Sequence, residues 1–337
     1  MINHHPQKDQ TEIPAHCPGV GNPRALRLQA SQQSQTVSEA DREEIPEKTC
    51  ERRGQTRRAE ESRMNRREKI SGSDPLIIGH RGASARAPEN TLVAFELAFL
   101  WGADGIEFDV RLARDGVPVC IHDRTLLRTV RIYGDVESYD STLLSQFYAG
   151  AWFNEGYPEY AIEGFEWERI PTLAQVFERY GAHHLYVEMK CEEPSRRAEL
   201  ARAVVGLMRE HGLAERVVVK SFEHDSLVEV KRLAPEIRTA ALFGRSWPRP
   251  LVPTARIIAE AESCGADEIS LHRSLLRKAT VEAAHSRGFR VVVWTVNSSV
   301  LLRRAVSLNL HAVITDHPRH LKAVLTQKLR PREGVRR

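Results

Sequence analysis

Apolar and polar positions alternate along residues 76–315 with two different periods, which predicts strands and helices in turn. Short apolar runs such as 76–78 and 217–219 have the length and composition of buried strands. Longer segments such as 195–211 and 299–307 carry apolar residues at helical spacing. Strands that alternate with helices of about ten or more residues predict βαβ units, a parallel sheet and right-handed crossovers.

The pattern contains nine candidate strands, one of which is the return arm of a hairpin. Residues 114–116 form a turn signal, so 117–122 should run back along the strand before it. Setting this arm aside leaves eight parallel strands, the number that closes a (β/α)8 TIM barrel. An open, doubly wound sheet is the alternative, but no glycine-rich phosphate loop supports it. The expected strands are 76–78, 106–110, 117–122, 184–190, 217–220, 237–243, 268–271, 290–295 and 312–315.

Composition divides the chain into a barrel domain at 74–325 and two tails. Residues 1–73 are rich in Gln, Ser, Arg, Glu and Pro, so they are expected to be a disordered N-terminal tail, and 326–337 a basic C-terminal tail. An insertion at about 125–171 interrupts the alternation and is rich in aromatic residues. We expect it to cover the pocket or to pack on the barrel. Met64 is an alternative start of translation.

Charge and cysteine usage narrow the possible classes of protein. The 49 basic and 45 acidic residues give a net charge of +4, which is too balanced to predict a nucleic-acid surface. The basic run 52–69 is interleaved with glutamates and is interpreted as a solvated linker, with a nucleic-acid arm as the alternative. The five cysteines show no C-x-x-C spacing, which favours a reducing compartment. Without a signal-peptide pattern or a long apolar run, the expected location is cytoplasmic, with no membrane span.

Two carboxylates share one face of the strand 106–110. Glu107 and Asp109 alternate with apolar residues, which therefore face the other way. Like charges this close repel each other unless a cation lies between them. Oxygen ligands suit one divalent cation, Mg²⁺ or Ca²⁺. Two solvated carboxylates on an edge strand are the alternative interpretation.

Two histidines are expected beside this pair of carboxylates. His80 follows the first strand, and His122 ends the hairpin arm, where counting outward from the turn places it roughly opposite Asp109. Two imidazoles that titrate near neutrality can divide the roles of general acid and general base.

Further charged groups extend the predicted site. Glu188 and Lys190 share one face of the strand 184–190, so Glu188 is expected to supply a third carboxylate to the metal. Lys190 suits a phosphate oxygen or one of the carboxylates, and Arg81 can bind a phosphate through two parallel hydrogen bonds. A metal ion, an arginine and a lysine together suit the anionic, tetrahedral group of a phosphodiester.

The chain resembles the glycerophosphodiester phosphodiesterase family over about residues 76–320, through separated motifs that occur in the family's order. These motifs are HRG at 80–82, PENT at 88–91, E-x-D at 107–109, the D-G turn at 115–116 and H-D at 122–123. The resemblance implies a TIM barrel that hydrolyses glycerophosphodiesters, such as glycerophosphocholine or glycerophosphoethanolamine, to sn-glycerol 3-phosphate and an alcohol. It also implies a residue set: His80 and His122 as acid and base, and Glu107, Asp109 and Glu188 as ligands of the divalent cation. Which histidine is the base, and whether water or the glycerol 2-hydroxyl attacks phosphorus, stay open.

Other residues are expected to support these groups. Trp294 lies at a strand end and is predicted to present an apolar wall to the glycerol carbons, with core packing as the alternative. Glu89 and Asn90 begin a helix and are expected to fix the loop before them, and Asp123 to orient its neighbours. Asp316, after the last strand, is interpreted as structural.

Two other functions stay open on sequence grounds. A lysophospholipase D-type activity on the same fold requires an apolar groove for an acyl chain, and the aromatic insertion is a candidate for it. A non-catalytic module that binds phosphorylated ligands belongs to a different class, but binding alone does not require a paired acid and base. We therefore expect a small-molecule glycerophosphodiester as the substrate, and no nucleic-acid partner.

Overall fold

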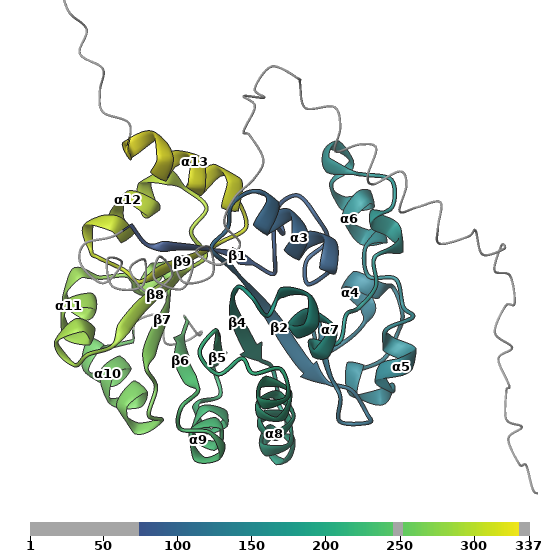
Figure 1. Ribbon diagram of the computed structural model, residues 1–337, viewed down its shortest axis with the longest axis horizontal. Helices are drawn as coiled ribbons and strands as arrows, with labels where there is room; N and C mark the ends of the chain where they lie inside the picture. Colours follow the sequence, from purple (N-terminus) through teal and green to yellow (C-terminus); the bar gives the residue numbers. More distant parts are fainter. Residues whose placement is uncertain (1–73, 245–251, 330–337) are drawn as a thin grey trace, which may run out of the picture. The chain divides into compact units, whose positions relative to one another are not determined.

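A closed barrel of eight parallel strands organises the chain (Figure 1). The computed structural model describes residues 74–244 and 252–329. In the described part, the strand order is β1-β9-β8-β7-β6-β5-β4-β2-β3, and β1 also pairs with β2, which closes the barrel. The predicted TIM barrel with a hairpin after the second strand is confirmed. The strands are β1 (Leu76–His80), β2 (Gly105–Leu112), β3 (Pro118–Cys120), β4 (His184–Met189), β5 (Val217–Ser221), β6 (Arg238–Phe243), β7 (Glu268–His272), β8 (Arg290–Trp294) and β9 (Ala312–Thr315).

Helices connect the strands on the outside of the barrel (Figure 1). Local capping fixes where several begin: Thr91 and Ser298 each accept a backbone hydrogen bond from the first turn of their helix, and Thr172 with Gln175 forms a capping box. The last helix runs through residues that the sequence assigned to the basic tail. The remaining predicted tail residues lie outside the described part. The main helices are α3 (Leu92–Leu100), α7 (Leu173–Tyr180), α8 (Pro194–Glu210), α9 (His224–Leu233), α10 (Thr254–Ser263), α11 (Lys278–Ser286), α12 (Ser299–Ser307) and α13 (Pro318–Leu329).

The aromatic insertion forms short helices that pack against the side of the barrel. Phe153 and Phe165 are buried against Ala87, in the loop before α3, and Ala94, in the first turn of α3. Figure 1 shows α4, α5 and α6 beside α3 and α7. Packing on the barrel is therefore one role of this segment. Its helices are α4 (Leu127–Val130), η1 (Val136–Ser138), α5 (Ser141–Leu144), α6 (Ala151–Gly156), η2 (Pro158–Tyr160) and η3 (Phe165–Trp167).

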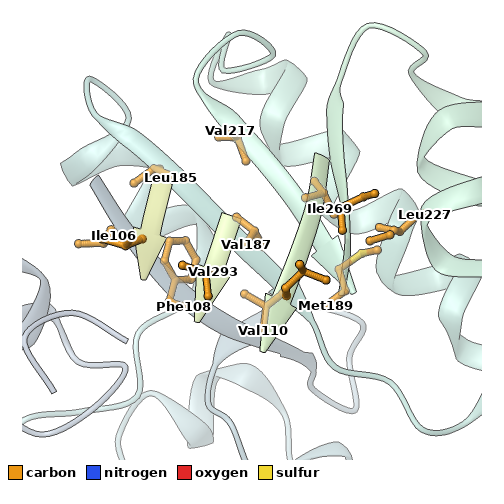
Figure 2. Packing of buried hydrophobic residues seen from close by; sticks show 14 of the residues in the cluster. Ile106, Phe108, Val110, Leu185, Val187, Met189, Val217, Leu227, Ile269 and Val293 are labelled. Atoms are coloured by element: carbon orange, nitrogen blue, oxygen red, sulfur yellow. The ribbon is translucent and has the colours of Figure 1, made fainter. Parts of the chain in front are cut away.

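The alternation on β2 separates the hydrophobic core from the polar interior of the barrel. Ile106, Phe108 and Val110 pack in the main apolar cluster with residues of neighbouring strands (Figure 2). Burying a side chain such as Phe108 contributes about 1.5–3 kcal/mol. The whole of β2 is buried. Glu107 and Asp109, on the opposite face, are therefore held inside the protein rather than in solvent, which rejects the edge-strand alternative.

The hairpin register differs by one residue from the expected one. β2 and β3 pair Val110 with Cys120, and the Ile121 N–H donates to the Asp109 carbonyl at 3.1 Å. Position 109 therefore faces residue 121 rather than His122. Counting outward from the predicted three-residue turn 114–116 gives this register, so the expected position of His122 was one residue too far along. The turn ends at Gly116, whose φ of +79° allows the tight return. His122 accordingly lies in the loop after β3 instead of ending a strand.

No helix in the described ranges is both long and apolar enough to cross a bilayer.

Candidate active site

Three predicted carboxylates meet inside the barrel near the carboxyl ends of their strands. The register places Asp109 of β2 beside Glu188 of β4, and His80 of β1 beside Glu107 of β2. Each carboxylate offers an oxygen, and these oxygens lie within 4.8 Å of one another. All three groups are buried. Strand ends at one mouth of a parallel barrel are where side chains from distant sequence positions can meet.

Arginine and lysine side chains surround Asp109. Arg81 Nε lies 3.1 Å from Asp109 Oδ2, and Lys190 Nζ lies 3.3 Å from its Oδ1. Lys190 also contacts Glu188. Burial alone would raise the pKa of the Asp109 carboxyl, but the charges of Arg81, Lys190 and His122 hold it well below its usual range. His122 thus reaches the same centre from its loop.

Lys220 belongs to this centre, although the sequence analysis did not select it. Its Nζ lies 2.9 Å from Glu107 Oε1 and 3.4 Å from Glu188 Oε2, and its side chain is only 2% exposed. Burial opposes its charge, but the carboxylates outweigh that effect and raise the pKa of Lys220. The signal was available: Lys220 lies two residues after Val218 on β5, so both side chains face the barrel interior, and Glu188 lies beside Lys220 on the next strand.

Each histidine is hydrogen-bonded to a carboxylate through Nδ1. His80 Nδ1 lies 2.6 Å from Asp316 Oδ1, and His122 Nδ1 lies 2.7 Å from Asp123 Oδ1. A carboxylate at Nδ1 fixes the ring orientation and favours the proton on that nitrogen, which leaves Nε2 as an acceptor. Burial would lower the pKa of His80, but Asp316 and Glu107 outweigh it and raise that pKa.

Asp316 was expected from the sequence to be only structural, but it is hydrogen-bonded to His80. It also accepts a hydrogen bond from Ser84 Oγ at 3.0 Å and one from Asn297 Nδ2. Burial opposes its charge, yet these donors and His80 lower the pKa of the Asp316 carboxyl to about 2 from an ordinary value of 3.8. The contact joins residues 236 positions apart, which is why local sequence patterns did not reveal it.

Replacing Asp316 by asparagine is expected to lower the free energy of unfolding by about 2 kcal/mol at pH 5, because the folded carboxyl holds its charge more firmly than the unfolded one. Since the folded pKa is the lower one, this stability is present above the unfolded value of about 3.8 and is lost as pH falls towards about 2. Urea unfolding at several pH values should show the two proteins converging below pH 4. A difference that stays constant with pH would contradict the assignment.

The loop before α3 supports the centre through Asn90 and Glu89. Asn90 Nδ2 donates to Asp109 Oδ2 at 3.0 Å, and the Asp109 N–H donates to Asn90 Oδ1 at 3.2 Å. Glu89 accepts from Arg81 Nη1 at 2.8 Å and from both Nη atoms of Arg128. The insertion therefore reaches the site through Arg128, which also donates to Asp123.

An aromatic pair lies on the rim of the barrel beside Lys190. Trp294 and Phe222 pack edge to face with ring centroids 5.7 Å apart, and Lys190 Nζ lies 5.8 Å from the Phe222 ring. Phe222 is 41% exposed and was not selected from the sequence. The pair offers an apolar surface next to the charged centre, as was expected of Trp294 alone.

The carboxylates also have the donor chemistry of a divalent metal site. Hard oxygen ligands are those that Mg²⁺ and Ca²⁺ prefer. Glu188 Oε1 is a buried oxygen that receives no hydrogen bond in the described part of the chain, although Lys190 contacts it. Buried acceptors are normally satisfied, so this oxygen is suited to a ligand. Glu107, Asp109 and Glu188 therefore fit a divalent cation.

Comparison with known proteins gives consistent matches over the barrel. The model of the glycerophosphoryl diester phosphodiesterase family matches residues 80–320. A glycerophosphodiester phosphodiesterase of Caldanaerobacter subterraneus subsp. tengcongensis is 34% identical over 251 residues, which cover 73% of this chain and 96% of that protein. One of Bacillus subtilis is 30% identical over 250 residues, which cover 72% of this chain and 84% of that protein.

Solved structures agree with these matches. An Oleispira antarctica phosphodiesterase in complex with the product sn-glycerol-3-phosphate has a TM-score of 0.65 at 30% identity, over 75% of this chain and 97% of that one. A glycerophosphodiester phosphodiesterase from Agrobacterium tumefaciens has a TM-score of 0.60 at 27% identity, over 74% of this chain and 99% of that one.

Proposed function

Because this chain belongs to the glycerophosphoryl diester phosphodiesterase family, we propose that it hydrolyses glycerophosphodiesters with one divalent cation and two histidines. The family makes it a phosphoric diester hydrolase. The proposal for its substrate is a small glycerophosphodiester, cleaved to sn-glycerol 3-phosphate and an alcohol. The observation that carries the proposal is the cluster of three buried carboxylates, with His80 Nε2 4.0 Å from Glu107 Oε2 and with His80 and His122 each hydrogen-bonded to a carboxylate at Nδ1.

The cationic side chains suit the phosphate of the substrate. Arg81 and Lys190 are partly accessible at the mouth of the barrel, with side chains 18% and 16% exposed. A guanidinium can hold two phosphate oxygens at once, and an ammonium can approach a third as a point charge. Trp294 is proposed to lie against the glycerol carbons.

The two histidines are proposed to move protons during cleavage. With Nδ1–H donating its hydrogen bond to the neighbouring carboxylate, Nε2 of one imidazole can take a proton from the attacking hydroxyl. The other, protonated on both nitrogens, can give a proton to the departing alcohol oxygen. Asp316 and Asp123 hold the orientation of the two rings through these hydrogen bonds. Water or the glycerol 2-hydroxyl serves equally as the attacking group in this scheme.

Glu107, Asp109 and Glu188 would hold the cation, which when bound supplies positive charge to the phosphoryl oxygens. Mg²⁺ and Ca²⁺ both suit three carboxylates. Lys190 and Lys220 contact the same carboxylates and keep the buried charge low. The free thiols of Cys120, Cys191 and Cys264 in the described part of the chain support a reducing location such as the cytoplasm.

Removal of divalent ions with a chelator is expected to abolish turnover, and Mg²⁺ or Ca²⁺ to restore it. The assay is release of sn-glycerol 3-phosphate from glycerophosphocholine and glycerophosphoethanolamine, before and after chelation. A lysophospholipid in the same panel distinguishes the lysophospholipase D-type alternative, which predicts faster turnover of that substrate. Full activity in metal-free buffer would refute the cation as a component of the site.

A further inference from the structure

A polar hollow of about 210 Å³ opens beside the candidate active site. Lys190, at the end of β4, lines it and also contacts the carboxylate centre. The other charged residues that line it are Arg111 on β2, Arg124 before α4, Glu137 on η1, and Glu192 and Glu193 after β4. With about 30 Å³ for each water molecule in the liquid, the space suits a small polar group.

The hollow is connected to His122 as well as to Lys190. Arg111 Nε donates to the His122 carbonyl oxygen at 2.8 Å, so one wall of the hollow holds the loop that carries this histidine. The order of the strands around the barrel places the hollow and the aromatic pair on different sides of β4. Its walls lie on the β2 side of β4, whereas Phe222 follows β5 and Trp294 ends β8. Lys190 therefore lies between a polar hollow and an apolar wall.

This division matches the two halves of a phosphodiester. Lys190 is proposed to bind the phosphate, and the glycerol carbons suit the aromatic side. The second alcohol of the ester, the head group, must then extend to the other side of Lys190. The hollow is the space that the structure offers there.

The acidic side chains decide what kind of head group the hollow suits. Glu192 accepts two hydrogen bonds from Arg111, at 2.7 and 2.8 Å, which lower the pKa of its carboxyl to about 2 and keep it charged at neutral pH. Glu137 accepts from Arg196 through Oε2 at 3.0 Å. Each carboxylate oxygen has two lone pairs, so both groups have acceptor capacity left for a ligand.

The types of side chain that line the hollow also indicate which head group it suits. The described residues around the hollow include no aromatic ring. Quaternary ammonium groups cannot donate hydrogen bonds and are bound in proteins mainly by aromatic faces. A primary ammonium, by contrast, has three N–H donors that carboxylates accept in charge-assisted hydrogen bonds.

We propose that this hollow binds the head group of the substrate, and that Glu137 gives it a preference for a primary ammonium over a quaternary one. The inference rests on the proposed function of the same site. Glycerophosphoethanolamine is then a better substrate than glycerophosphocholine, with the difference in kcat/KM about tenfold, as one charge-assisted hydrogen bond supplies.

The test compares kcat/KM for these two substrates in the wild type and in Glu137→Gln, with the divalent ion at a fixed saturating concentration. The amide keeps the size of the side chain and an acceptor for Arg196, but it removes the charge. The expected result is a loss of about tenfold with glycerophosphoethanolamine and an unchanged value with glycerophosphocholine.

Glu199→Gln is the matched control, because Glu199 pairs with the same Arg196 but does not line the hollow. It should leave both substrates unchanged. Equal kcat/KM values for the two substrates in the wild type, or an equal loss with both in Glu137→Gln, would overturn the head-group assignment while the proposed function stands. Hydrolysis of neither diester would overturn the proposed function itself, and with it this inference.

Discussion

Replacing His80 or His122 by alanine is expected to lower kcat by about 10²–10⁴-fold, the contribution of a positioned acid or base. Each ring is held by a carboxylate at Nδ1, so its loss removes proton transfer at Nε2 and leaves the phosphate-binding cations in place. KM should change much less than kcat. The measurement is steady-state kinetics on a glycerophosphodiester, together with thermal unfolding of each variant.

His320→Ala is the matched control for this prediction. His320 is exposed on α13 and is none of the residues placed in the candidate site, so its removal should leave kcat unchanged. A wild-type kcat in His80→Ala or His122→Ala would show that the replaced histidine is neither the general acid nor the general base. An alanine variant that shows no cooperative thermal unfolding has failed to fold, so its kcat does not test the prediction. In that case kcat is measured on His80→Gln or His122→Gln instead.

Lys220→Met is expected to lower the free energy of unfolding by about 3–5 kcal/mol in the presence of chelator, the cost of removing one partner from a buried ion pair. Lys220 is almost fully buried between Glu107 and Glu188, so methionine leaves both carboxylates without this cation. Urea unfolding followed by circular dichroism measures the change. Divalent ion should recover part of the lost stability if it binds the same oxygens.

Lys322→Met provides the comparison for a partly exposed pair. Lys322 Nζ lies 2.7 Å from Asp104 Oδ2, but the two side chains are 28% and 23% exposed. Pairs with access to water contribute about 0–1 kcal/mol. Equal destabilisation by the two lysine substitutions would show that the burial of Lys220 does not matter to the stability of the barrel.

Local patterns were sufficient to predict the barrel and most of the charged centre. The strands are short apolar runs, the helices have helical spacing, and the alternation along β2 and β4 placed Glu107, Asp109 and Glu188 on interior faces. These signals lie within a few residues of each other, so no knowledge of tertiary contacts was needed. The strand end and the hairpin arm indicated His80 and His122, and the family motifs implied the same two residues.

Contacts between distant segments were what the patterns could not supply. Asp316 meets His80 across 236 positions, and Phe222 becomes part of the rim only because β5 and β8 belong to the same barrel. The hairpin error has a different origin. The turn was predicted at the residues where it occurs, but a count along its arms that is wrong by one residue places a side chain on the other face of the strand.

The hydrogen bond between His80 and Asp316 has a consequence for how the protein matures. β1 lies between β2 and β9, so the first and the last of the described strands in chain order pair with each other. A nascent chain that lacks residue 316 has neither the final seam nor the carboxylate that orients His80. The closed barrel and the hydrogen bond at His80 therefore form only after β9 and residue 316 have been translated.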